Sequence, residues 1–106
     1  ITESNFEAQF ADQRWQQLQK RHNFQAVQLL CWAADDVLTQ RYLGRIADGS
    51  RHPGHVDRIR SDEFDPGALR ERYTFLAIPG YRQAIDTGQL DEPDHRLLVA
   101  WLKERL

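Results

Sequence analysis

The hydrophobic positions between residues 24 and 48 recur at steps of three and four, which is the period of an α-helix. Asn23 suits the N-cap of such a helix, and Gly49 suits the position just after its end. Two apolar stripes run along opposite sides, so neighbouring elements would have to cover both. We therefore predict a central helix over 24–48. Its stripes are Phe24, Val27, Cys31, Ala34 and Leu38, and Leu29, Trp32, Leu43 and Ile46.

Amphipathic patterns before and after this stretch predict further helices. Ser4 and Glu7 have the spacing of a capping box, and Asp65 followed by proline is a strong helix start. Pro79 breaks the pattern, and no segment alternates long enough to predict a strand. The sequence therefore predicts an all-α fold: a small irregular bundle of four main helices, with a short fifth after the break. The predicted helices span residues 5–22, 24–48, 66–78, 80–87 and 92–105.

Residues 50–65 are predicted to form a long loop, because they contain Pro53 and Gly54 and show no helical period. A loop of this length in a small domain is often functional. The same composition also suits a plain connector, and the sequence leaves both interpretations open.

Composition limits the classes of partner. The chain has 106 residues, 41% of them hydrophobic, and a formal net charge of −2. This size predicts one domain over residues 1–106. The charge gives no overall attraction to nucleic acid or to an acidic membrane surface. No apolar run approaches the roughly 20 residues of a membrane span, so we expect no membrane partner.

Two features of composition bear on the cellular location and the processing of the chain. Cys31 is the only cysteine, so it cannot form an intrachain disulfide, and its place on the apolar face predicts a small buried side chain. A reducing, cytoplasmic location fits this cysteine usage. The sequence begins with Ile1 and contains no methionine, so we expect a trimmed or processed form, or a segment of a longer protein.

Charged residues within the central stretch are the best candidates for chemistry. Asp35 and Asp36 are neighbours, so on a helix they point about 100° apart and do not face each other. Carboxylates in apolar surroundings need solvent or a cationic partner. Ion pairs that tie helices together are the simpler interpretation. The alternative is a polar pocket in which Asp35 or Asp36 lies beside Arg41 or Arg45, with Tyr42.

His52 and His55 resemble part of a metal-ligand run, but the sequence offers no second cluster to complete a zinc site. We therefore predict no metal and no cofactor. The stretch from Arg45 to Arg60 is locally basic, and nearby acids compensate it, so nucleic-acid binding is only a weak alternative. Glycine-rich phosphate loops, nucleophile elbows and HExxH motifs are all absent from the sequence.

The leading functional prediction is a non-catalytic interaction or adaptor domain that binds another protein, as a homodimer or as a segment of a larger protein. An enzymatic or ligand-binding pocket on the central helix is the alternative, and enzymatic activity is the less favoured of the two. Binding to the partner is predicted to involve Leu29, Trp32, Asp36, Arg41, Tyr42, Arg45, Arg51, His52, His55 and Arg58.

Overall fold

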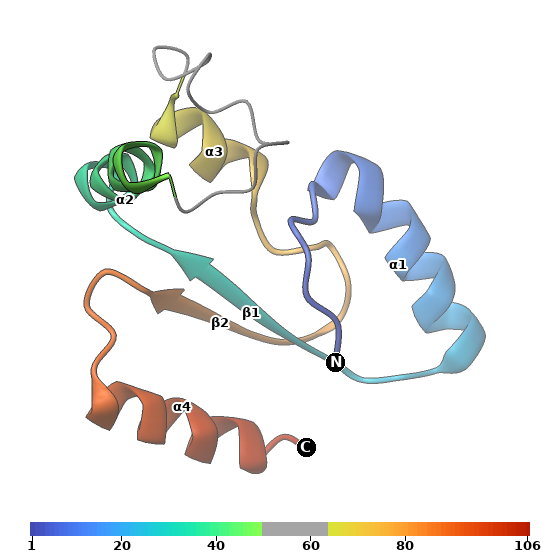
Figure 1. Ribbon diagram of the computed structural model, residues 1–106. Coiled ribbons are helices and arrows are strands. Elements are labelled where there is room, and N and C mark those ends of the chain that lie inside the picture. Colours follow the sequence, from blue (N-terminus) through green and yellow to red (C-terminus); the bar gives the residue numbers. More distant parts are fainter. Residues whose placement is uncertain (50–63) are drawn as a thin grey trace.

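The computed structural model describes residues 1–49 and 64–106, and it shows a mixed α/β fold. Two parallel strands lie between α1 and α4, and α2 and α3 lie beyond the ends toward which the strands point (Figure 1). The predicted all-α bundle is therefore wrong. The elements in chain order are α1 (Ala8–His22), β1 (Ala26–Trp32), α2 (Asp35–Asp48), α3 (Pro66–Arg72), β2 (Gly80–Asp86) and α4 (Glu92–Lys103).

Strand β1 occupies the first part of the stretch that was predicted as one central helix. The helix α2 begins only at Asp35, so the prediction over 24–48 is wrong for residues 24–34. A short apolar run fits a buried strand as well as a helix, and Ala, Leu and Gln favour the helix by local propensity. Pairing with a strand far away in sequence decides the outcome. The pairing runs in parallel from Ala26 opposite Gly80 to Trp32 opposite Asp86.

The change from helix to strand alters the predicted surroundings of several side chains. Cys31, predicted to be buried, is exposed. Leu29 and Trp32 lie on the sheet rather than on the helix that carries Arg41, and each is 41% exposed. The predicted apolar stripes of a single helix therefore do not exist.

Strand β2 occupies residues predicted as the short helix 80–87, so that prediction is also wrong. Pro79 does end the preceding segment, but an extended strand follows it. Gly80 has a φ of 146°, which residues with a side chain rarely adopt. A Cβ atom at this position would collide with the carbonyl group of Ala26. Glycine at residue 80 therefore allows the two strands to meet at the start of the sheet.

Asn23 ends α1 instead of beginning a central helix. It has a φ of 49° and a ψ of 46°, in the left-handed region that asparagine tolerates, and its N–H donates to the Gln19 carbonyl at 2.7 Å. The predicted capping box of Ser4 and Glu7 is not formed. Glu7 occupies the N-cap position without a capping hydrogen bond from its side chain. The first helix therefore begins at Ala8, three residues later than predicted.

The last two helices begin at strong local signals. Asp65 accepts a hydrogen bond from the Ala68 N–H at 3.1 Å, and proline follows it. Asp91 and Asp94 form a reciprocal capping box at the start of α4. Helix α3 ends at Arg72, however, so the helix predicted over 66–78 is too long.

Side chains from β1 and α1 form hydrogen bonds with backbone groups of the segment between α3 and β2. The Leu76 N–H donates to Gln28 Oε1 at 2.8 Å, and Gln28 Nε2 donates to the Leu76 carbonyl at 3.2 Å. Ala77 donates to Asp12 Oδ1 at 2.8 Å and accepts from Gln16 Nε2 at 2.8 Å. These four hydrogen bonds satisfy backbone groups of residues 76 and 77 and hold the segment in place without a helix.

Gln28→Ala is expected to lower the free energy of unfolding by about 1–3 kcal/mol, because it leaves the N–H of buried Leu76 without its acceptor. Urea unfolding followed by circular dichroism measures this loss. Gln17→Ala, at an exposed position on α1, is the control and should change stability by less than about 0.5 kcal/mol. Equal effects of the two substitutions would contradict the bridging role of Gln28.

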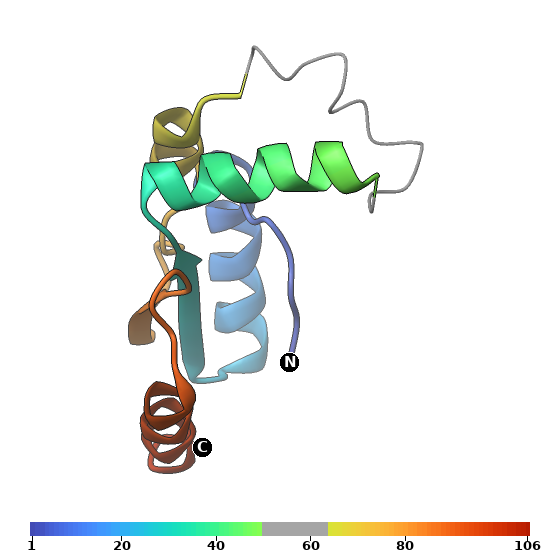
Figure 2. The same cartoon turned by 60° about the vertical axis from the view of Figure 1, so that its left-hand side comes forward.

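The buried core is small, and only some of its residues belong to one cluster. One cluster joins Ala26, Leu76 and Ile78, with Trp15 and Phe24 among the partly buried side chains around it. Figure 2 shows β1 along its length, with α1 beside it and α4 below both. No helix in the described part of the chain is long and apolar enough to cross a membrane. The buried hydrophobic residues of the described chain are Ala26, Ala33, Tyr42, Leu76, Ile78 and Ile85.

Candidate functional site

The carboxyl ends of β1 and β2 form the edge of the sheet where open α/β folds bind their ligands. Thr87, which directly follows β2, ties the two strand ends together. Its N–H and its Oγ1 both donate to the Trp32 carbonyl, at 2.8 and 3.0 Å. The carboxyl edge is thus held by a threonine that the sequence analysis did not single out.

Arg41 of α2 reaches back over this edge. Its Nη1 donates to Thr87 Oγ1 at 2.9 Å, and its Nη2 donates to the Thr87 carbonyl at 2.7 Å. No carboxylate in the described part of the chain forms an ion pair with Arg41. A guanidinium has five N–H donors in a fixed plane, so Arg41 keeps donors and an uncompensated charge for an anion. Phosphate oxygens suit this geometry.

Asp35 and Asp36 are the acids that the alternative interpretation placed beside Arg41 or Arg45. Asp35 instead pairs with Arg70 of α3, and both side chains are about half exposed. This ion pair links α2 to α3, as the simpler interpretation of the acids expected. Exposed pairs of this kind contribute little stability, so its main effect is to place a second guanidinium near the start of α2.

The remaining candidates fall into four groups. Tyr42 is buried, and its ring stacks on that of Phe64 with centroids 4.1 Å apart and planes 4° from parallel. Asp36 and Arg45 are exposed on α2, on the same helix as Arg41. Leu29 and Trp32 lie on β1. Outside the described residues lie most of the loop predicted over 50–65 and the candidates Arg51, His52, His55 and Arg58.

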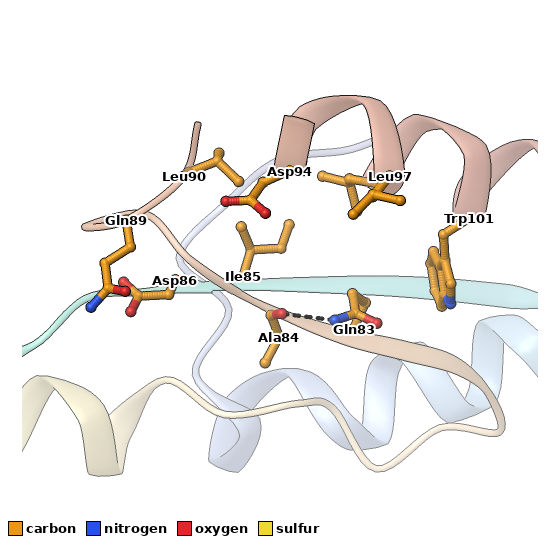
Figure 3. Close-up of a pocket in the computed structure, with 10 residues that line it drawn as sticks. Gln83, Ala84, Ile85, Asp86, Gln89, Leu90, Asp94, Leu97 and Trp101 are labelled. Carbon is orange, nitrogen blue, oxygen red and sulfur yellow. Dashed lines mark hydrogen bonds between the residues drawn. The ribbon is translucent and has the colours of Figure 1, made fainter. Parts of the chain in front are cut away.

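A groove of about 440 Å³ between β2 and α4 was not predicted from the sequence. Figure 3 shows Asp86 at one end of it, Trp101 at the other, and Ile85, Asp94 and Leu97 between them. Both carboxylates already accept hydrogen bonds from backbone N–H groups. Asp86 accepts from the Gly88 N–H at 2.9 Å, and Asp94 accepts from the Asp91 N–H at 3.2 Å.

The residues that line this groove include two acids and no basic side chain, so it repels a phosphate rather than binding it. Nor does the described chain contain a group of three or more metal-ligating side chains. The carboxyl edge with Arg41 is therefore the better candidate for an anionic ligand.

Comparison with solved structures gives one informative likeness. The chain is similar to a crystal structure from Chloroflexus aurantiacus J-10-fl, of a protein provisionally assigned as a kinase, with a TM-score of 0.73 and 35% sequence identity. The likeness covers 97% of this chain and 56% of that one, so this chain spans about half the length of the structure it matches. No protein-family model matches the chain, and no curated protein does either.

This likeness overturns the leading functional prediction. Over nearly its whole length the chain resembles a protein provisionally assigned as a kinase, and this likeness does not support a non-catalytic adaptor that acts only by protein binding. The alternative prediction, an enzymatic or ligand-binding site built on the helix that carries Asp35, Asp36 and Arg41, agrees better with the comparison.

Proposed function

We propose that the chain forms part of a kinase-like enzyme that transfers a phosphoryl group. The similarity to the Chloroflexus protein carries this proposal, because 35% identity over 97% of the chain is accompanied by a common fold. Since the match covers 56% of the other protein, the activity is proposed for the whole enzyme, and this chain supplies one part of it.

The part supplied by this chain is a positive charge at the carboxyl edge of the sheet. Phosphoryl transfer depends on positioning and on cations that stabilise charge on the transferred group. Arg41 is anchored by two hydrogen bonds to Thr87 and has no carboxylate partner in the described residues. A side chain anchored in this way is pre-organised to meet a phosphate without a large loss of its own freedom.

A cytoplasmic location remains part of the proposal. Cys31 is the only cysteine, and it is an exposed free thiol. Free thiols of this kind are typical of reducing compartments.

Arg41→Ala is expected to weaken binding of Mg·ATP about tenfold or more, because hydrogen bonds to charged groups contribute about 1.5–3 kcal/mol each. Isothermal titration calorimetry of the whole chain measures the change. Arg41→Lys should restore only part of the affinity, because lysine keeps the charge and loses the planar fork.

The matched control is Arg21→Ala, which removes an exposed arginine from the last turn of α1 and should leave the affinity within about twofold. If Arg41→Ala and Arg21→Ala weaken binding equally, or if the wild-type chain does not bind Mg·ATP, the proposed phosphate contact at the carboxyl edge is wrong.

A further inference from the structure

The two strands differ in composition in a way that assigns them different places in a sheet. Strand β1 is almost entirely apolar, whereas β2 carries Arg82, Gln83 and Asp86. Parallel strands with neighbours on both sides read as continuous hydrophobic runs, and edge strands carry charged residues. In the described part of the chain β1 pairs only with β2. Thus β1 has the sequence of an interior strand, and its second edge has no partner there (Figure 1).

Exposed apolar side chains on β1 also indicate that the sheet is incomplete. Leu29 and Trp32 lie on this strand, and each is 41% exposed. Parallel sheets normally have both faces covered, so these side chains mark a part of a sheet face that lacks its cover.

We propose that the free edge of β1 pairs with a strand from a second α/β segment of the same enzyme. That segment corresponds to the part of the Chloroflexus protein that has no counterpart in this chain. The likeness covers 97% of this chain and only 56% of the other, so the additional polypeptide of the longer protein is a ready source of such a strand. The contact completes the sheet of an enzyme and is not the recruitment of a separate protein by an adaptor.

A second copy of this chain fits the edge less well. A twofold axis through the edge would place two β1 strands antiparallel, which makes a mixed sheet and leaves only four strands. An α/β segment with its own parallel strands can add a parallel strand beside β1. The apolar sequence of β1 is typical of a strand inside such a parallel sheet. The inference draws on the structural likeness but does not depend on phosphoryl transfer.

The test uses the whole chain and, as the probe, the portion of the Chloroflexus protein without a counterpart here, expressed as a separate polypeptide. Size-exclusion chromatography with light scattering is expected to show a one-to-one complex. Amide hydrogen exchange should show that β1 amides which exchange freely in the isolated chain become protected at least tenfold in the complex, while the amides of β2 change little.

Two variants locate the contact. Leu29→Arg places a charge on β1 and should weaken the complex at least tenfold. Leu97→Arg places the same charge on α4, beside β2, and should leave the affinity within twofold. Equal weakening by both variants, or no complex at all with the wild-type chain, overturns the inference. So does a homodimer of this chain alone in which the same β1 amides are already protected. Because no assay here requires ATP turnover, a failure of the proposed kinase activity would be seen separately.

Discussion

Replacing Gly80 with alanine is expected to lower the free energy of unfolding by about 2–4 kcal/mol. The φ of 146° at this position is unfavourable for any residue with a side chain, and the added methyl group would meet the carbonyl of Ala26 in the paired strand. The chain would have to separate the two strands where their pairing begins. Urea unfolding followed by far-ultraviolet circular dichroism gives the change in stability.

The matched control is Gly44→Ala. Gly44 lies within α2, where a Cβ atom would have no neighbour within 4 Å, so alanine should stabilise the helix by about 0.5–1 kcal/mol. The two substitutions add the same methyl group and are predicted to have opposite signs. If Gly80→Ala is neutral or stabilising, the strand pairing described for β1 and β2 is wrong.

Tyr42→Ala is expected to cost about 3–5 kcal/mol, because it empties the space of a large buried aromatic side chain. Tyr42 is 6% exposed, and its ring stacks on Phe64 just before α3. Loss of the ring would loosen the contact between α2 and the start of α3, and with it the position of Arg41. The midpoint of urea unfolding measures the cost.

Leu43→Ala is the control for Tyr42, since it truncates the next residue of the same helix, which is 51% exposed. This change should cost less than about 1 kcal/mol. A similar loss for both substitutions would show that the face of α2 that carries Tyr42 is not the buried one.

Those parts of the fold that depend on local signals could be predicted from the sequence. Helix α3 begins at Pro66 because Asp65 caps it, and α2 ends at Asp48, where Gly49 with a φ of 65° forms the C-cap. These signals lie within a few residues of the feature that they determine. The sequence therefore indicates where such helices begin or end without knowledge of the tertiary structure.

The two strands could not be predicted in the same way. Residues 26–32 contain helix-favouring leucine and alanine, and only their pairing with residues 80–86 makes them a strand. The Pro79-Gly80 pair was informative, because a positive φ at the glycine permits the close approach of two strands, but it also fits a break between two helices. Information from more than 50 residues away decides between these interpretations.

The candidate site shows the same limit. Arg41 could be singled out as a charged residue close to an apolar stretch, but its partner Thr87 lies 46 residues away and carries no recognisable motif. The alternative interpretation placed Asp35 beside Arg41 or Arg45, whereas its partner is Arg70, 35 residues further along the chain. Residue types indicated a polar site, and the parallel pairing of two strands determines which side chains share it.

The central claim is that this α/β chain recognises a phosphate at the carboxyl edge of its sheet. Amide chemical shifts of the isotopically labelled whole chain, recorded during titration with Mg·ATP, test it most directly. The account predicts extended-strand shifts for residues 26–32, with the largest ligand-induced changes at Thr87 and in the first two turns of α2. Helical shifts for residues 26–32, or ligand-induced changes confined to the groove beside Asp94 and Leu97, would contradict it.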